Sequence, residues 1–351
     1  MLHARVVSHT LHFIVPGKTS RGTLHTKDSW YLLLHDSSVG YTGIGECSIL
    51  PNLSIDDRPD YLHKLEEVCS MINAGVPIDT LQLHEFPSII FALEMALADL
   101  ANHTHPQNIL FPSAFTEGKR GIPINGLVWM GSREYMEKQI KEKLEQGFNT
   151  IKLKVGALDF ETEIDILRNI RKQFSPNDIT LRLDANGAFT PQNALEKLQR
   201  FAEFSIHSIE QPIRQGQVEA MAALCAQTPI PIALDEELIG LFLPQQKEQL
   251  LKAINPQYII LKPSLVGGFA GSHEWIAAAE KQGAGWWITS ALEGNVGLNA
   301  IAQWTFTLNN PMPQGLGTGQ VFSNNIESPL TIDKGKLYYR PEKSWDLTVL
   351  Q

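Results

Sequence analysis

The sequence from residue 122 onward repeats one unit, a short apolar strand pattern followed by a loop and an amphipathic helix pattern, with a period of roughly 25–30 residues. The expected strand cores are 123–128, 150–155, 179–184, 206–210, 232–235, 258–262, 286–290 and 315–318. Strands that alternate with helices across short loops predict a parallel sheet, and eight such units favour a closed β/α barrel over an open doubly wound sheet.

The first 120 residues lack this repeat and read as a separate α+β domain. Strands are expected at 6–15 and 30–35, and helices at 56–74 and 87–102. Residues 40–46 are expected to form a turn-rich connector whose glycines suit tight bends or close approach of the backbone to another segment. Proline, serine and glycine cluster before residue 120 and indicate a boundary. We therefore predict an α+β domain over 1–120, a barrel carrying the active site over 121–325, and a C-terminal segment, 326–351, that returns to the first domain.

Composition narrows the class of partner. A net charge of −9 and a pI near 5.7 argue against nucleic-acid binding and leave a small-molecule carboxylate as the expected partner. We find no apolar run of about 18 residues and no signal-peptide core, so no membrane association is expected. Three widely spaced cysteines fit a reducing cytoplasm. The sequence leaves the oligomeric state open.

Charged residues stand at the ends of five consecutive predicted strands of the barrel. These residues are Lys154, Asp184, Glu210, Asp235 and Lys262. Active-site groups converge at the carboxyl ends of barrel strands. A single acid after a strand is often only a helix cap or a solvated loop residue, but the series indicates a catalytic centre.

The three acids of this series predict a metal site. Asp184, Glu210 and Asp235 would offer hard oxygen ligands from adjacent strands, which suits Mg²⁺, with Mn²⁺ as a substitute; zinc is disfavoured because the trio contains no histidine or cysteine. Arg182 and Asn186 alternate onto the same face as Asp184, where they are expected to orient ligands or bind substrate. The alternative for Arg182 is an internal salt bridge that neutralises buried charge.

The lysines predict a proton transfer. Lys152 and Lys154 share one strand face, and Lys154 and Lys262 should lie on opposite sides of the metal, since their strands face each other across an eight-stranded barrel. A lysine acts as a base only when neutral, and a neighbouring cation lowers a lysine pKa. A lysine base beside a divalent metal suits abstraction of a proton α to a carboxylate. Alternatively, the lysines are only structural partners of the acids.

Two weaker signals concern substrate binding. The glycine-rich run at 315–319, which includes Gly317 and Thr318, could cradle a phosphate or simply make room for a bulky substrate. Ser290 follows the seventh predicted strand and could bind substrate, although a serine there is more often a helix cap. We include Ser290, Gly317 and Thr318 among the predicted substrate contacts.

Taken together, these motifs resemble the enolase superfamily, in its muconate-lactonizing-enzyme branch. The similar segments are Gly43-Ile44-Gly45-Glu46, Lys152-Leu153-Lys154, Arg182-Leu183-Asp184-Ala185-Asn186-Gly187, Glu210-Gln211-Pro212, Asp235-Glu236 and Leu261-Lys262-Pro263. The resemblance covers nearly the whole chain and implies a modified TIM-like (β/α)7β barrel with an α+β capping domain. It also implies that the three acids hold Mg²⁺ and that Lys152 tunes Lys154.

The late segments 289–304 and 314–319 most resemble the o-succinylbenzoate synthase family of menaquinone biosynthesis. That resemblance implies a carbon–oxygen lyase that dehydrates 2-succinyl-6-hydroxy-2,4-cyclohexadiene-1-carboxylate to o-succinylbenzoate. Lys154 would remove the ring proton and then, as an ammonium, assist departure of the hydroxyl group. Lys262 would stabilise the enediolate by its charge.

Sister activities remain alternatives. Dipeptide epimerases usually carry an aspartate-x-aspartate motif at the eighth strand, and Gly317-Thr318-Gly319 at that place counts against a dipeptide substrate. N-acylamino acid racemase activity stays open, because two opposed lysines are what racemisation requires. A non-catalytic ligand-binding barrel is less favoured, since a pure binder does not need opposed bases.

Overall fold

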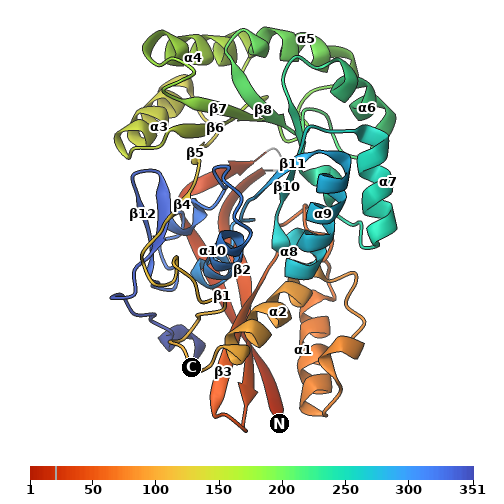
Figure 1. Ribbon diagram of the computed structural model, residues 1–351, viewed down its shortest axis with the longest axis vertical. Helices are drawn as coiled ribbons and strands as arrows, with labels where there is room; N and C mark the ends of the chain where they lie inside the picture. Colours follow the sequence, from red (N-terminus) through yellow and green to blue (C-terminus); the bar gives the residue numbers. More distant parts are fainter. Residues whose placement is uncertain (20–21) are drawn as a thin grey trace.

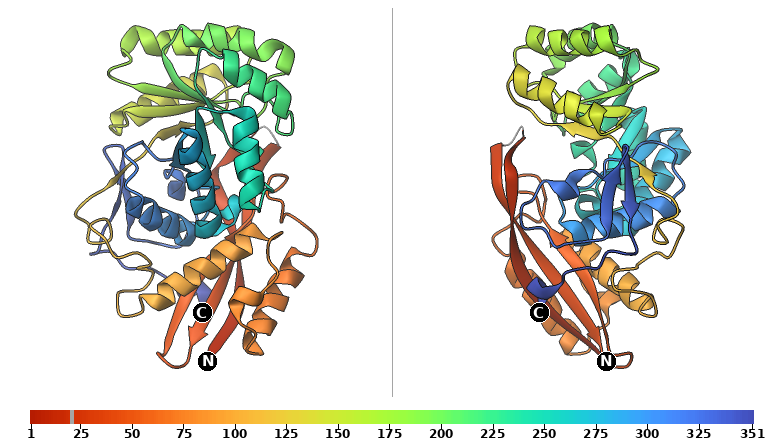
Figure 2. Two further views of the ribbon diagram at one scale, coloured as in Figure 1. Left: turned by 45° about the vertical axis from the view of Figure 1, so that its right-hand side comes forward. Right: turned by 90° about the vertical axis from the view of Figure 1, so that its left-hand side faces the viewer.

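The computed structural model describes residues 1–19 and 22–351. An N-terminal antiparallel sheet in the order β1-β2-β3 is formed by β1 (Leu2–Thr19), β2 (Gly22–Asp36) and β3 (Tyr41–Ser48). Helices α1 (Tyr61–Asn73) and α2 (Pro87–Ala101) lie beside this sheet, at the end of the molecule that holds both termini (Figure 1). In Figure 2, β1 and β2 run from that end to the side of the barrel.

Strand β3 corrects one expectation, because residues 40–46 were predicted as a connector and most of them are strand. Gly43 and Gly45, the two glycines within β3, permit close packing instead of forming turns. A Cβ atom on Gly45 would lie 1.9 Å from the carbonyl oxygen of Ala92, and one on Gly43 would lie 2.1 Å from that of Ala96. Strand β3 therefore lies directly against the backbone of α2.

The barrel predicted from the repeat is present. Within residues 22–351, seven parallel strands form one sheet, paired in the order β5 (Gly126–Val128), β6 (Thr150–Lys154), β7 (Thr180–Asp184), β8 (Ile206–Glu210), β9 (Ile232–Leu234), β10 (Tyr258–Leu261) and β11 (Gly285–Ile288). The helices of the repeat are α3 (Arg133–Glu145), α4 (Phe160–Gln173), α5 (Pro191–Ala202), α6 (Val218–Gln227), α7 (Pro244–Ile254), α8 (Pro263–Val266), α9 (Gly268–Gln282) and α10 (Asn295–Thr307). This confirms the predicted TIM-like fold with an α+β cap.

The eighth stave is shorter than predicted and begins one residue earlier. Gln314 bridges Ile124 and Gly315 bridges Thr289, both in parallel orientation. The Gln314 amide donates to the carbonyl of Pro123 at 2.8 Å, and the Gly315 amide donates to that of Ile288 at 2.8 Å. Thr318–Gln320 is a 3₁₀ helix (η3) instead of strand. The barrel is thus closed by two residues, which we call the Gln314–Gly315 seam.

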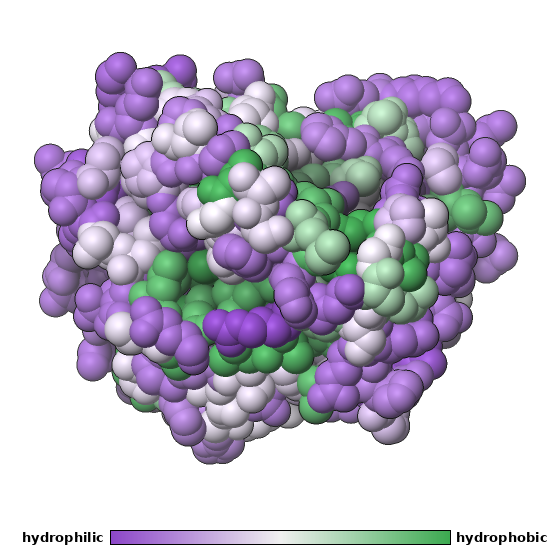
Figure 3. Space-filling model, turned by 90° about the horizontal axis from the view of Figure 1, so that it is seen from below, coloured by the Kyte–Doolittle hydropathy of each residue, from purple (hydrophilic) through white to green (hydrophobic). Residues whose placement is uncertain are grey.

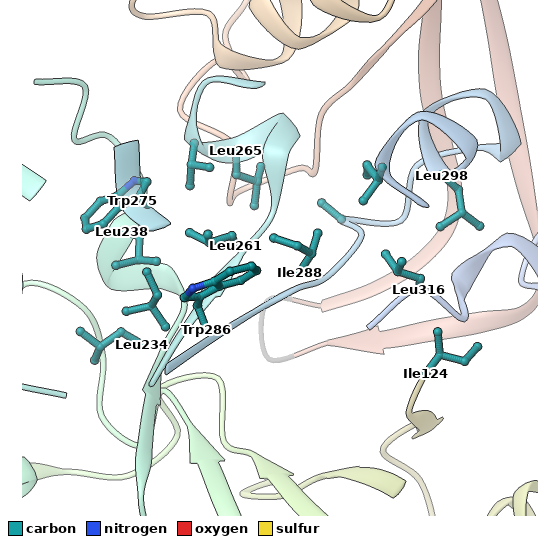
Figure 4. Packing of buried hydrophobic residues seen from close by; sticks show 14 of the residues in the cluster. Ile124, Leu234, Leu238, Leu261, Leu265, Trp275, Trp286, Ile288, Leu298 and Leu316 are labelled. Carbon is teal, nitrogen blue, oxygen red and sulfur yellow. The ribbon is translucent and has the colours of Figure 1, made fainter. Parts of the chain in front are cut away.

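Alternating strand residues divide the packing between two layers. Leu261 on β10 belongs to the large cluster beneath the helices, where Figure 4 shows it near Leu234, Leu238 and Trp286. Ile260, its neighbour in sequence, instead packs with Ala233 and Trp287 in a separate cluster. This alternation follows from the two-residue period of a strand and leaves one face of each strand for the site.

The C-terminal segment contacts both parts of the molecule. Strands β12 (Leu330–Asp333) and β13 (Lys336–Tyr339) form an antiparallel sheet with β4 (Ile122–Pro123) at the start of the barrel. Further along, Leu350 packs in one cluster with Tyr31 of β2 and Ile44 of β3. The divisions at residues 120 and 325 stay predictions.

The surface is ordinary for a folded chain of this composition. Seen from below, it is mostly hydrophilic, with hydrophobic residues gathered in hollows (Figure 3). Among the described residues, no helix combines the length and the apolar character needed to cross a membrane.

Candidate active site

A cavity of about 120 Å³ opens where the carboxyl ends of the barrel strands meet the N-terminal region. Its described lining residues are Leu50, Leu53, Asn125, Leu127, Trp129, Lys152, Lys154, Asp184, Asn186, Glu236, Lys262, Thr289, Ser290, Ala291, Leu292, Gly315, Gly317 and Thr318. The lining combines apolar and charged side chains. A cavity lined by apolar groups and a few convergent charged groups suits a small organic acid.

Strand register explains how the charged groups meet. Lys154 on β6 pairs with Asp184 on β7, which in turn pairs with Glu210 on β8. Because side chains two residues apart share a face, Lys152 points to the same side as Lys154. Three neighbouring strands therefore direct two lysines and two acids into one space.

The ammonium groups lie between the acids that were predicted to bind metal. Lys152 Nζ lies 2.9 Å from Asp184 Oδ2 and also donates a hydrogen bond to Glu210 Oε2. Lys262 Nζ donates to Asp235 Oδ2 and lies 3.9 Å from Glu210 Oε1. The structure thus brings both lysines and all three acids into one buried ion-pair network.

Lys154 occupies the opposite flank of this network from Lys262. Its Nζ donates to Asp184 Oδ2 at 2.9 Å and to Asn186 Oδ1 at 2.5 Å, and Asn186 Nδ2 donates to Glu236 Oε1 at 3.1 Å. Strands β7, β8 and β9 separate β6 from β10, so the two lysines approach the cavity from different staves. This order agrees with the predicted opposition.

Burial and charge set the proton affinities of the acids. Burial, together with the charge of Asp184, raises the pKa of Glu210 to about 7. Burial likewise raises the pKa of Asp235. Burial opposes ionisation of Asp184 too, but Lys152 and Lys154 outweigh it and hold the pKa of Asp184 well below its ordinary value. The acids are therefore unequal, and Glu210 is the one most short of positive charge.

The lysines respond in the opposite sense. Burial alone would lower the pKa of Lys262, but Asp235 and Glu210 outweigh burial and raise it well above its ordinary value. The pKa of Lys152 is raised in the same way by Asp184 and Glu210. Lys152 is therefore a charged partner of the acids in this structure, in addition to standing beside Lys154.

The donor chemistry of the acids fits a divalent cation. Glu210 Oε1 is buried, and no described residue donates a hydrogen bond to it. Four carboxylates, counting Glu236, meet three ammonium groups, which leaves one net negative charge. Among the described residues, no three acids, histidines or cysteines are already gathered at metal-binding spacing, since ammonium groups lie between them. A hard cation would supply the charge that Glu210 lacks.

Most predicted substrate contacts line the cavity, but Arg182 does not. Asn186, Ser290, Gly317 and Thr318 are part of the lining, and the Ser290 and Thr318 hydroxyl groups are hydrogen-bonded to each other. Arg182 is only 2 % exposed, lies outside the described lining, and donates to the Pro313 carbonyl at 2.8 Å.

The environment of Arg182 suggests a different role from the predicted substrate contact, which stays a prediction. Its guanidinium carbon lies 4.1 Å from the centroid of the Trp287 ring, and burial lowers the pKa of Arg182 to about 10. Arg182 thus contacts an aromatic ring and a carbonyl, and it reaches the cavity only indirectly, through a 3.4 Å hydrogen bond to Oδ1 of the lining residue Asn125. Arg182 faces the same way as Asp184 but two residues deeper, so the strand period located its face and not its depth.

Sequence reasoning missed two groups of lining residues. Glu236 directly follows Asp235, and that acidic pair after a strand could have signalled it. Leu50, Leu53 and Trp129 come from loops, and no short-range pattern marks a loop residue that reaches a site far along the chain.

Comparison with known proteins agrees with this geometry. Residues 135–343 match the family model described as enolase C-terminal domain-like. A closed parallel barrel with acids on β7, β8 and after β9, flanked by lysines and covered by an antiparallel cap, is an enzyme of the enolase superfamily.

Individual relatives narrow the family. The chain is 46 % identical to an o-succinylbenzoate synthase from Desulfotalea psychrophila over 358 residues, which cover 93 % of this chain and 96 % of the relative. The crystal structure of MenC from Desulfotalea psychrophila superposes with a TM-score of 0.84 at 42 % identity, covering 96 % of this chain and 99 % of that chain. An L-Ala-D/L-Glu epimerase from Bacillus subtilis is 30 % identical over 52 % of this chain and 50 % of its own length. The chain belongs to the o-succinylbenzoate synthase family, and is a lyase of the dehydratase type.

Proposed function

We propose that the cavity dehydrates 2-succinyl-6-hydroxy-2,4-cyclohexadiene-1-carboxylate to o-succinylbenzoate, with Lys154 as the base. The observation that carries this proposal is the pair of lysines, Lys154 and Lys262, that reach one cavity from β6 and β10 across a buried set of acids. Membership of the family supplies the substrate, and the lysine and acid geometry supplies the chemistry.

Lys154 is placed to move the proton. Its ammonium is held by Asp184 and Asn186 and faces the cavity, so the neutral amine would be held in one direction. Such an amine can take the ring proton next to the carboxylate. The resulting ammonium can then protonate the departing hydroxyl group, which releases water and leaves an aromatic ring.

Lys262 and Lys152 are placed to stabilise negative charge. The pKa of Lys262 is raised by Asp235 and Glu210, so Lys262 stays protonated and suits electrostatic stabilisation of an enediolate. Lys152 joins Asp184 to Glu210 and so fixes two acids relative to Lys154. We propose that Lys152 acts through these contacts.

Asp184, Glu210 and Asp235 would hold Mg²⁺. When bound there, the cation supplies positive charge to the substrate carboxylate as the enediolate forms. Mn²⁺, which prefers the same oxygen ligands, is expected to substitute. Support comes from the donor set and from the buried, unbonded Glu210 Oε1.

The apolar wall suits the ring of the substrate. Leu50, Leu53, Trp129 and Leu292 line the same cavity as the charged groups, and we call these four residues the apolar wall. An aromatic product packs favourably against such a surface. We propose that the ring lies against this wall and that Asn186, Ser290, Gly317 and Thr318 contact the polar substituents.

We also propose a cytoplasmic location for this enzyme. Cys47, Cys69 and Cys225 are all buried free thiols, which fits a reducing compartment.

The test is an assay of the purified protein with the cyclohexadiene substrate and Mg²⁺, followed by the absorbance of the aromatic product. Turnover that disappears in Lys154→Ala is expected. Absence of turnover in the wild type, with Mg²⁺ present, would contradict the proposal.

Racemisation of N-succinyl amino acids is a second candidate activity, because two lysines on different staves can exchange a proton on both faces of one carbon. Incubation in D₂O distinguishes the two activities. Deuterium at the α carbon of an N-succinyl amino acid would demonstrate racemase chemistry, whereas loss of water from the diene demonstrates the lyase.

A further inference from the structure

A buried charged cluster lies between the N-terminal sheet and the barrel and takes part in no step proposed above. It comprises Lys27 of β2, Glu46 of β3 and Glu293, which follows β11; we call it the Lys27 cluster. Lys27 is 2 % exposed, and Glu46 and Glu293 are 0 % exposed. Burial of three charged side chains is costly unless each is paired and hydrogen-bonded, so their contacts indicate what the cluster holds.

Lys27 provides the positive charge of this cluster. Its Nζ donates to the hydroxyl groups of Ser48 and, at 3.3 Å, Ser29, and the Ser29 hydroxyl donates to Glu46 Oε1 at 3.0 Å. Burial lowers the pKa of Lys27, while the nearby charges of Glu46 and Glu293 oppose that effect. Lys27 is therefore joined to Glu46 through the Ser29 hydroxyl, and its charge also acts on Glu293.

Glu46 holds the start of α10. Its Oε1 accepts from the Gly294 amide at 2.6 Å and its Oε2 accepts from the Gly297 amide at 2.8 Å. Amides at a helix N-terminus lack partners within the helix and favour a negative charge. The Glu46 side chain thereby fixes the segment that leads from the cavity wall into α10.

Glu293 holds the cavity wall itself. Its Oε2 accepts from the Ala291 amide at 2.6 Å, and its Oε1 accepts from the Ser264 hydroxyl at 2.6 Å. Ala291 lines the cavity, and Ser264 stands two residues after Lys262. The same carboxylate thus ties the wall after β11 to the segment that follows Lys262.

The segment held in this way is strained. Leu292, which lines the cavity, has a φ of 60°, a left-handed conformation that is unfavourable for a side chain such as leucine. Its side chain packs with Leu11 of β1 and with Phe322. A strained residue keeps such a conformation only when its surroundings impose it.

We infer that Lys27 is a positioning residue for this active site: its charge allows Glu46 and Glu293 to hold residues 290–294, and through Ser264 the segment after Lys262, in the geometry that binds substrate. The kinetic test of this inference rests on the proposed dehydration. A second test, by amide hydrogen exchange, needs no activity.

The kinetic test compares Lys27→Met with Lys247→Met. Lys247 is a matched control because it is 1 % exposed and pairs with Glu274 at 2.6 Å, but it joins α7 to α9 outside the cavity lining. We expect Lys27→Met to raise KM at least tenfold, with a smaller fall in kcat, because Lys154 and the acids remain. Lys247→Met should keep KM within twofold of the wild type. Equal KM values in the two variants would overturn the inference.

A second substitution tests the charge argument. In Lys27→Met/Glu293→Gln, the amide oxygen can accept from Ala291 and the amide nitrogen can donate to Ser264, so the contacts of residue 293 survive and only Glu46 keeps an unbalanced charge. We expect the KM of this double variant to be at least threefold lower than the KM of Lys27→Met. A double variant that is worse than Lys27→Met would overturn the role of charge.

Amide hydrogen exchange reports positioning without any substrate. The amides of Ala291, Gly294 and Gly297 donate to the two carboxylates, so a peptide covering 290–297 should exchange at least tenfold faster in Lys27→Met than in Lys247→Met. Unchanged exchange would overturn the inference, whereas inactivity of the wild type with the diene would contradict only the proposed function. If Lys27→Met does not fold, Ser264→Ala provides the test, because it removes the hydrogen bond between Ser264 and Glu293. A rise in KM of at least threefold supports the inference, and a wild-type KM overturns it.

Discussion

Lys154 and Asp184, from neighbouring strands, are joined by a hydrogen bond of 2.9 Å between Nζ and Oδ2. The same oxygen lies 2.9 Å from Lys152 Nζ, so one acid orients both lysines of β6. An amine held in this manner has a fixed direction, which a proton acceptor needs.

Replacement of Lys154 by alanine should therefore remove catalysis and spare binding. We expect kcat to fall by about 10²–10⁴-fold, the usual contribution of a general base, with product affinity changed little. Steady-state kinetics and calorimetric titration with o-succinylbenzoate measure the two effects. Lys138→Ala on the exposed face of α3 is the control, and near-normal turnover in Lys154→Ala would end the assignment of the base.

Replacement of Asp235 by asparagine should weaken metal binding and turnover together. Loss of one anionic ligand should lower Mg²⁺ affinity by at least about tenfold, because the site then has less negative charge to offer. Titration of the protein with Mg²⁺ measures this directly. Asp165→Asn, at an exposed ion pair on α4, should change nothing; unaltered affinity in Asp235→Asn would remove Asp235 from the ligand set.

Replacement of Arg182 by methionine should affect stability instead of substrate binding. The Pro313 carbonyl would lose its donor, at a cost of about 1–3 kcal/mol in the free energy of unfolding. Product affinity should stay within twofold of the wild type. Asn186→Ala, which alters the cavity lining, is expected to lower product affinity with little change in the free energy of unfolding. A large loss of product affinity in Arg182→Met would restore Arg182 as a substrate contact.

Two glycines should respond differently to an added methyl group. Gly45→Ala places a Cβ atom 1.9 Å from the Ala92 oxygen and should lower the free energy of unfolding by about 1–3 kcal/mol or more. Gly317→Ala meets nothing nearer than the Asn125 oxygen at 3.7 Å, so the fold should tolerate it while KM rises. Chemical denaturation and kinetics separate the two. A stable Gly45→Ala variant would show that β3 and α2 can move apart.

Glu94 should make stability depend on pH. Burial raises the pKa of Glu94 to about 7, although its carboxylate accepts from the Phe269 and Ala270 amides at the start of α9. Between pH 4.5 and 7 the folded chain then binds more protons at this group than the unfolded chain, so stability falls as pH rises. Urea denaturation across this range should show a shallower fall in Glu94→Gln. Identical slopes would contradict the assignment.

The repeat in the sequence predicted the barrel well, and the reason is physical. Strand and helix periods are local properties, so β6 to β8 and their helices could be located from spacing alone. The same periods placed Lys154, Asp184 and Lys262 at strand ends that line the cavity.

Long-range packing escaped that reasoning. The glycines of β3 left tight bends and close backbone approach both open, because only the position of α2 shows that Gly43 and Gly45 permit close approach. Arg182 was placed at the substrate, because spacing gives the face of a strand but not the depth of a residue. Glu46 and Glu293 meet around Lys27 although they are far apart in sequence, and no local pattern predicts such an encounter.

Closure of the barrel depends on only two residues, the Gln314–Gly315 seam, which is the weakest part of the sheet. No side chain fits at Gly315, where a Cβ atom would lie 2.3 Å from Thr289 Oγ1, and the next residues already leave the sheet. A bulky replacement or a backbone cleavage at this seam would break its hydrogen bonds to the neighbouring strands and convert the closed barrel into an open sheet. Water would then reach the reacting carbon from the side, even with every ionisable group still in place.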